Sequence, residues 1–345
     1  MAYTTIPKST AQFNTKLYTG NYSTNAITAV GFQPDLTWIK SRTTAGEDHY
    51  LFDAIRGVTN YIHSNTSAAQ GTNSATLTTF GSDGFTVGAN NSVNKSSDSL
   101  VSWNWKANGQ GSANTDGTIN STYTSANTTS GFSIVQYTGN GTAGATVGHG
   151  LGAAVKTIII KKYNTSSDWV YGSSGMGFTK YMNLNSTGAE SAYAGMFNDT
   201  APTSSVFTLG ADGQVNTNGG TYVAYCFADV QGFSKMGSYL GNGNANGTFA
   251  YTGFKPAFIL VKNTGSVRNW QIYDSKRIGY NYNNYRLPPN TAGSEESNLN
   301  IDIYSNGFKT LATDADVNEN AKTYIFLAFA EEPLVSTNGQ PATAR

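Results

Sequence analysis

Three similar stretches of alternating residues, at 100–107, 222–228 and 324–330, constrain the fold of this chain more than any other feature. Each stretch has the period of two that is typical of a strand. One face of each begins with a β-branched residue and ends with a large aromatic residue, as in a strand that feeds a core. These pairs are Val101 and Trp105, Val223 and Phe227, and Ile325 and Phe329. Three such strands predict three copies of one structural unit.

Two further landmarks recur in the first and third copies. Residues 31–40 (GFQPDLTWIK) correspond to residues 253–262 (GFKPAFILVK), and each stretch ends on a lysine. An aspartate followed three residues later by an arginine also occurs in both copies. The offset between the copies is 222 at the lysines, 221 at the aspartates and 224 at the closing aromatic residues. Because the register holds over this length, a duplicated unit is the best explanation.

The fold class that this pattern predicts is all-β, with three tandem antiparallel β-sandwich repeats. Short β-rich runs are separated by Gly, Asn, Asp and Ser, and no window shows a helical apolar period. We expect the second and third copies to pack on each other and the first to be held more loosely. The boundaries are an N-terminal arm at 1–11, repeats at 12–107, 132–229 and 230–330, a Gly/Ser/Thr/Asn-rich linker or surface strap at 108–131, and a C-terminal tail at 331–345.

Charge and hydropathy exclude several classes of function. Only 12% of the residues are charged, and 21 basic residues balance 21 acidic ones. This balance provides no electrostatic footprint for nucleic acid or an anionic membrane. No apolar run reaches the roughly 18 residues of a membrane span, and the start lacks the features of a secretory signal. We therefore expect synthesis in a cytoplasm, without membrane insertion, and a buried, unreactive Cys226.

No familiar catalytic or cofactor motif is present. The glycine-rich stretches 139–144 and 241–247 have neither the helix nor the P-loop lysine that phosphate binding requires, so hairpin tips are favoured. Residues 314–320 begin like a calcium loop, but Glu319 replaces the glycine at its sixth place and Ile325 the acid at its twelfth. A solvated loop is favoured there, although other calcium geometries stay open. The prediction is no catalytic residue, no cofactor and no metal ligand.

Two groups of residues are candidates for a site. The first is a repeated polar set, for which we favour a buried ion pair over a ligand clamp; its members are Lys40, Asp53, Arg56, Lys262, Asp274 and Arg277. The second is a tyrosine- and asparagine-rich stretch that the other copies lack, and exposed aromatic residues beside asparagines are typical of sugar or protein contacts. Its candidate contact residues are Tyr280, Tyr282, Tyr285 and Arg286.

Several of these motifs carry a family resemblance. Besides residues 31–40, they are FDAIRG at 52–57, SDGF at 82–85, WNWKA at 103–107, AFAEEPLV at 328–335 and PATAR at 341–345. With them the chain resembles the repeated β-sandwich proteins of marine bacteriophages, a family of uncharacterised domains labelled lectin-like, with a jelly-roll or concanavalin A-like fold. The resemblance covers nearly the whole chain and implies a virion protein without defined catalytic residues. The second copy lacks the proline and the Asp/Arg pair, so a site built on them cannot be threefold.

The leading hypothesis is therefore a phage virion structural protein, associated with the tail or a tail fibre, that adds reach and surface. Its expected partners are other virion proteins, copies of itself (a trimer by analogy with fibres) and host-surface glycan, but not nucleic acid. One alternative is capsid decoration at the head surface. A second is a polysaccharide-degrading enzyme on a lectin-like sandwich, and a third is a plain sugar-binding module.

Overall fold

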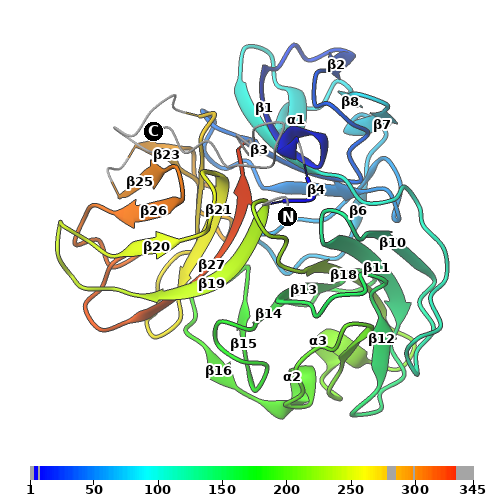
Figure 1. Cartoon of the computed structure of the whole chain (residues 1–345). Coiled ribbons are helices and arrows are strands. Elements are labelled where there is room, and N and C mark those ends of the chain that lie inside the picture. The colour runs from blue at the N-terminus through cyan, green and yellow to red at the C-terminus, as the bar shows by residue number, and fades with distance from the viewer. Residues whose placement is uncertain (1–3, 7, 278–284, 298–299, 332–345) are drawn as a thin grey trace.

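The chain is built almost entirely of antiparallel β-strands (Figure 1). The computed structural model describes residues 4–6, 8–277, 285–297 and 300–331. The prediction of an all-β protein is confirmed, because the α-helices in this part of the chain are three single turns, α1 (Asn91–Asn94), α2 (Ala194–Phe197) and α3 (Gly213–Asn216), beside a short 3-10 helix, η1 (Ser9–Ala11). Over the same residues, no helix has the length and apolar character needed to cross a membrane.

The first segment (residues 8–107) has two sheets that pack face to face. The larger one has the order β1 (Phe13–Thr19), β9 (Ser99–Trp105), β3 (Leu36–Ser41), β4 (Tyr50–Asp53). The smaller one has the order β2 (Asn25–Ile27), β8 (Gly84–Val87), β7 (Leu77–Gly81), and a short hairpin is formed by β5 (Asn60–Tyr61) and β6 (Gly71–Thr72). Apolar residues from both sheets, among them Ile39, Phe52 and Phe85, form one buried layer between them.

The second segment (residues 108–229) contains a seven-stranded sheet and a two-stranded one. The large sheet has the order β10 (Tyr123–Asn127), β11 (Phe132–Thr138), β18 (Thr221–Phe227), β13 (Thr157–Lys162), β14 (Trp169–Ser173), β15 (Lys180–Asn183), β16 (Ser191–Ala192). The small one pairs β12 (Thr146–Gly148) with β17 (Val206–Thr208). The expected linker at 108–131 therefore contains an edge strand, β10. Main-chain hydrogen bonds to β11 hold this strand in place, although neither of its faces is wholly apolar.

The third segment (residues 230–331) has the same order of four strands as the other two. They are β19 (Ser234–Leu240), β27 (Thr323–Ala330), β21 (Pro256–Asn263) and β22 (Gln271–Asp274), which correspond to β1-β9-β3-β4 and β11-β18-β13-β14. The smaller sheets are β20 (Phe249–Tyr251), β26 (Gly307–Thr310), β25 (Ile301–Tyr304) and the pair β23 (Tyr285–Arg286) with β24 (Glu296–Ser297). Residues at matching register positions in these sheets are called equivalent below.

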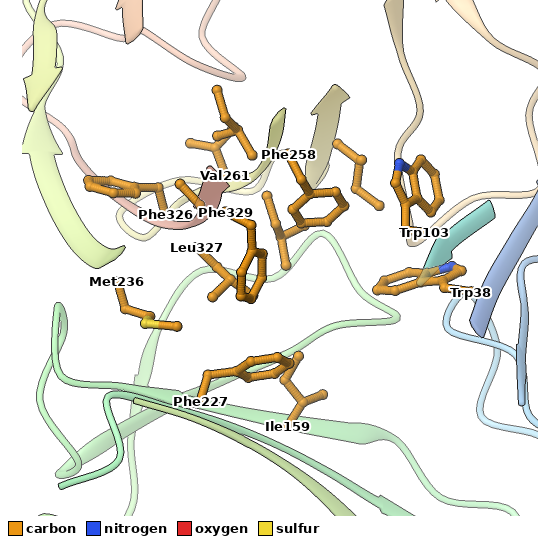
Figure 2. Close-up of a cluster of buried hydrophobic side chains, with 14 of the residues drawn as sticks. Trp38, Trp103, Ile159, Phe227, Met236, Phe258, Val261, Phe326, Leu327 and Phe329 are labelled. Atoms are coloured by element: carbon orange, nitrogen blue, oxygen red, sulfur yellow. The ribbon is translucent and has the colours of Figure 1, made fainter. Parts of the chain in front are cut away.

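The three closing strands β9, β18 and β27 turn one face toward a common centre. In Figure 1 the blue, green and yellow-to-red segments surround this centre as three lobes. Trp105, Phe227 and Phe329 are all buried in a single cluster there, with ring centroids 5.8 Å apart for Trp105–Phe329 and 5.9 Å for Phe227–Phe329. Figure 2 shows the rings of Phe227, Phe258 and Phe329 converging from different strands. The segments therefore share one hydrophobic core.

A ring of hydrogen bonds joins the segments around this core. The indole of Trp270 donates to the carbonyl of Asn183 at 3.1 Å, and the indole of Trp169 donates to the carbonyl of His63 at 2.7 Å. The third bond joins His49 Nε2 to the carbonyl of Pro288 at 3.1 Å. The three donors are equivalent, so the third segment binds the second, the second binds the first and the first binds the third.

The first segment, which we expected to be held more loosely, makes direct contacts with both other segments. Its Arg42 bonds to Glu295 at 2.8 Å, and its Phe13 ring stacks on Phe329 at 5.1 Å. On the side of the second segment, Gln70 donates its main-chain N–H to the carbonyl of Tyr163 at 2.8 Å. The polar composition of the linker predicted a flexible connection. The aromatic face of β9 is nevertheless buried in the core that the three segments share.

We expect Phe329→Ala to lower the free energy of unfolding by about 3–5 kcal/mol, because the cavity would open where rings from all three segments meet. Equilibrium denaturation in guanidinium, followed by tryptophan fluorescence, measures this change. The matched control is Phe249→Ala, since this ring is 42% exposed and its loss should change stability by less than about 1 kcal/mol. Equal effects from the two variants would contradict a shared core.

Candidate functional site

The repeated aspartate and arginine form a buried ion pair. Asp53 ends β4, and Arg56 in the following turn binds it with Nε at 2.6 Å and with its main-chain N–H at 2.8 Å. A further guanidinium nitrogen, Nη2, donates to the carbonyl of Leu51 at 3.0 Å. Burial alone would lower the pKa of Arg56, but Asp53 and Tyr225 raise it above its usual value. The pair is fully shielded from solvent, so the arrangement ties a loop to a sheet and does not present a ligand clamp.

The third segment repeats this geometry around Asp274 and Arg277. The Nε–Oδ2 distance is again 2.6 Å, and Nη2 of the arginine donates to the carbonyl of Ile272 at 2.8 Å. In this segment Arg277 Nη1 also lies 3.3 Å from Glu295. The guanidinium carbon stands 5.6 Å from the centre of the Trp103 ring, which adds a cation–π contact.

Each buried aspartate also accepts a hydrogen bond from the closing strand of another segment. Tyr225 donates its hydroxyl to Asp53 Oδ2 at 2.8 Å, and Trp103 donates its indole N–H to Asp274 Oδ2 at 2.9 Å. At the third boundary the equivalent donor and acceptor positions hold Leu327 and Ser173. Leu327 offers no donor, and the Ser173 hydroxyl accepts instead from the main-chain N–H of Gly175 at 3.2 Å, so it is not left buried without a partner.

The lysines do not join this set. Lys40 pairs in the sheet with Val101, whereas Asp53 stands opposite Leu36 at the other end of β3. Nζ of Lys40 donates to the carbonyl of Ser41 at 3.0 Å, and Nζ of Lys262 donates to the carbonyl of Asn263 at 2.7 Å. Burial lowers the pKa of each lysine to about 8. The sequence placed the lysine and the aspartate in one set because they lie close along the chain, but the strand and the turn that follows it separate them.

The tyrosine-rich candidate is divided. Tyr280 and Tyr282 lie outside the described residues, while Tyr285 and Arg286 form β23 and are partly buried. Arg286 binds Glu296 at 2.8 Å, Asp314 at 3.2 Å and Asp316 at 3.1 Å. The guanidinium therefore stands between the first two acids of the candidate calcium loop. Among the described residues there is no group of three or more His, Cys, Asp or Glu side chains that could hold a metal ion.

The glycine-rich stretches are loops in which most main-chain N–H groups are already bonded. Oδ1 of Asn216 accepts from the N–H of Asn140 at 2.9 Å, and Oδ1 of Asn318 accepts from the N–H of Asn242 at 3.0 Å. Asn94 holds the main-chain N–H of Asn21 at 3.0 Å in the same way. A phosphate would have to compete with these fully buried amides for its donors.

Sequence reasoning missed these three asparagines, although a signal exists. A Val-Asn dipeptide recurs shortly before each closing strand, at 93–94, 215–216 and 317–318, and all six residues are buried. It also missed an exposed aromatic pair on β20. Phe249 and Tyr251 are 42% and 62% exposed and flank the buried Ala250, which is the period of two expected of an edge strand with one outer face.

His49 forms hydrogen bonds through both of its ring nitrogens. Trp38 donates its indole N–H to Nδ1 at 2.9 Å, so the imidazole proton resides on Nε2 and is donated to Pro288. Burial lowers the pKa of His49 well below its usual value, which keeps the ring neutral. The imidazole therefore serves as a fixed hydrogen-bond relay between two segments, without free capacity for acid–base chemistry.

The buried lysines predict a pH dependence. Between about pH 8 and 10 the unfolded chain keeps these lysines protonated while the folded chain releases their protons, so stability should rise with pH. Lys40→Met should reduce this slope by at most about 1.4 kcal/mol per pH unit, and adding Lys262→Met should reduce it further. Urea unfolding at pH 7.5–9.5 measures the slopes, and the partial ionisation of tyrosines in the unfolded chain near the upper limit is common to all three proteins and cancels in the comparison. Identical slopes in all three proteins would contradict the prediction.

Comparison with known proteins identifies a family. A family model described as a domain of unknown function (DUF7483) matches residues 8–333. Among curated proteins and among solved structures, none matches the chain. The matched range includes all three segments and both buried ion pairs.

Proposed function

The chain belongs to this family of unknown function (DUF7483), and we propose that it is a structural protein of a bacteriophage particle, associated with the tail or a tail fibre. In this proposal one β-sandwich unit, jelly-roll or concanavalin A-like, was copied twice to give three tandem repeats. The protein adds reach and surface to the particle and joins other virion proteins. It has no catalytic role.

The observation that carries the proposal is the use of the recurring polar residues. Asp53 and Asp274 with their arginines, and the donors His49, Trp169 and Trp270, all bond within the protein and mostly across segment boundaries. Residues that recur thus serve assembly of the three segments, as expected of a rigid scaffold. The motif resemblance to phage β-sandwich proteins gives this scaffold its proposed location.

Antibodies against the purified chain, viewed by electron microscopy on particles of the phage that encodes it, test the location. We expect gold label on the tail or its fibres. Label confined to the head surface would support the capsid-decoration alternative and overturn the tail assignment. Purified particles without any label, in a preparation where a known tail protein is labelled, would overturn the virion role itself.

A second candidate function, binding of host-surface glycan, is favoured by the outer face of the β20-β26-β25 sheet. Phe249, Tyr251 and the ring of Tyr304 gather there, with Phe249 and Tyr304 in edge-to-face contact at 5.9 Å. Lys309, next to Phe249 across the strands, donates to Asn246. At the positions equivalent to Phe249 and Tyr251, the first segment has Ala26 and Thr28 and the second has Thr146 and Gly148. Aromatic residues beside polar groups suit the apolar face and hydroxyl groups of a sugar ring.

A glycan array, probed with labelled protein with and without a calcium chelator, tests this face. We expect binding that Tyr251→Ala weakens about tenfold, because a stacked ring contributes on the order of 1 kcal/mol or more. Tyr22→Ala is the matched control, since Tyr22 is 50% exposed on the first segment. Equal losses in both variants would contradict a site at Tyr251, and release of reducing ends from a bound polysaccharide would support the enzyme alternative instead.

A further inference from the structure

Strand β1 has an open edge. Within the described part of the chain it pairs with β9 alone. Two main-chain bonds flank this ladder: the N–H of Lys106 donates to the carbonyl of Gln12, and the N–H of Gly20 donates to the carbonyl of Asp98. They determine which residues of β1 form hydrogen bonds with β9. Since antiparallel pairing alternates, the main-chain N–H and C=O groups of Thr15 and Leu17 point away from β9. No strand among the described residues pairs with them.

The equivalent edges of the other two segments are occupied at the position that matches Thr15. In the second segment, β10 pairs along β11, and Thr122 donates its N–H to the carbonyl of Gln136 at 2.7 Å. In the third segment, Asp229 accepts from the N–H of Met236 at 2.7 Å. The other oxygen of the same carboxylate lies 3.0 Å from Lys235 Nζ. The outer edge of β11 therefore pairs with a strand, and the outer edge of β19 binds a carboxylate that also forms an ion pair with a lysine.

A groove of about 620 Å³ lies along the open edge of β1. It is formed where the first and third segments meet and is lined by Lys8, Thr10, Asn14, Thr15, Lys16, Leu17, Ala29, Val30, Gly31 and Lys276. The lining residues include three lysines and no acid. Lys276 is 3.9 Å from Glu331, whereas Lys8 and Lys16 have no ion pair within the described residues. Thr15 is 4% exposed, and its buried hydroxyl has no hydrogen-bond partner among the residues that the structure describes.

We propose that this groove binds an extended, acidic peptide segment of a partner protein, which adds to the sheet as a strand beside β1. The open N–H and C=O groups of Thr15 and Leu17 form the main-chain bonds, as those of β11 do with β10. Carboxylates of the added strand meet Lys8 and Lys16, as Asp229 meets Lys235 in the third segment. The inference goes beyond the proposed function and does not depend on the phage assignment.

Charge selects this occupant over two others. Lysines along an open edge disfavour pairing with a second copy, because the same lysines would then approach each other. A polyanion that is not a peptide would satisfy the lysines but not the main-chain groups of β1. An acidic strand satisfies both sets of groups at once.

The test uses two blocked peptides, Thr-Glu-Val-Glu-Thr-Glu and Thr-Lys-Val-Lys-Thr-Lys, with fluorescence anisotropy as the readout on the full chain. We expect the glutamate peptide to bind and the lysine peptide not to bind. Lys16→Glu should raise the dissociation constant about tenfold or more. Leu17→Pro should do the same, because it removes an outward N–H that the ladder to β9 does not use.

Ser238→Pro is the matched control, since Ser238 occupies the equivalent outward position on β19. It should leave the affinity unchanged, and circular dichroism of both proline variants verifies folding. Amide hydrogen exchange gives an independent measurement, in which the glutamate peptide should slow exchange at Leu17.

Four results would overturn the assignment. These are no binding of the glutamate peptide to the native chain, equal binding of the lysine peptide, unchanged affinity in a folded Leu17→Pro variant, and unchanged exchange at Leu17. A sulfated heparin hexasaccharide whose binding survives Leu17→Pro would assign the groove to a non-peptide polyanion. A dimer in sedimentation that Leu17→Pro dissociates would assign the edge to a second copy.

Discussion

Burial of the aromatic faces of the three closing strands is the interaction on which the rest of the structure depends. Each of β9, β18 and β27 presents a large ring that its own segment cannot cover from both sides, because the small sheet of that segment packs on the opposite face. Association of the three faces removes these rings from water together. The buried ion pairs and the ring of indole and imidazole bonds then fix the angle at which the faces meet.

The polar groups at the segment boundaries illustrate a general rule of buried polarity. Tyr225 and Trp103 each find an aspartate whose charge is already balanced by an arginine, so neither aspartate is a buried charge without its partner. At the position where the second segment has Ser173 in place of the acid, the residue in the donor position is Leu327, and the serine hydroxyl binds the N–H of Gly175. Both solutions are self-consistent, and a mixture of the two would leave a donor or a charge unsatisfied.

Much of the fold could be predicted from the sequence, because a strand with one buried face leaves a period of two that needs no tertiary information. The closing strands, the glycine-rich loops and the scarcity of helix all follow from such local patterns. The pairing of Asp53 with Arg56 was also accessible, since the residues are three apart at a strand end. The separation of Lys40 from that pair could not be predicted, because it depends on how β3 aligns with β4 and β9 in the sheet.

Other features required the three-dimensional arrangement. The strand β10 has too few apolar residues to be distinguished from a linker, and it is held by main-chain bonds that any sequence could make. The bond from His49 to Pro288 joins residues 239 positions apart, so no local window contains it. The open edge of β1 becomes visible only when the equivalent edges are compared in space.

The closed ring of contacts has a consequence for synthesis of the protein. A nascent chain releases Trp105 and then Phe227 from the ribosome well before β27, so these rings stay without their final neighbours until Phe329 has emerged. The segments follow one another along the chain, but no segment can bury the aromatic face of its closing strand before the other two segments are present. The outer sheets can therefore form in chain order, whereas the shared centre can be completed only once β27 is present.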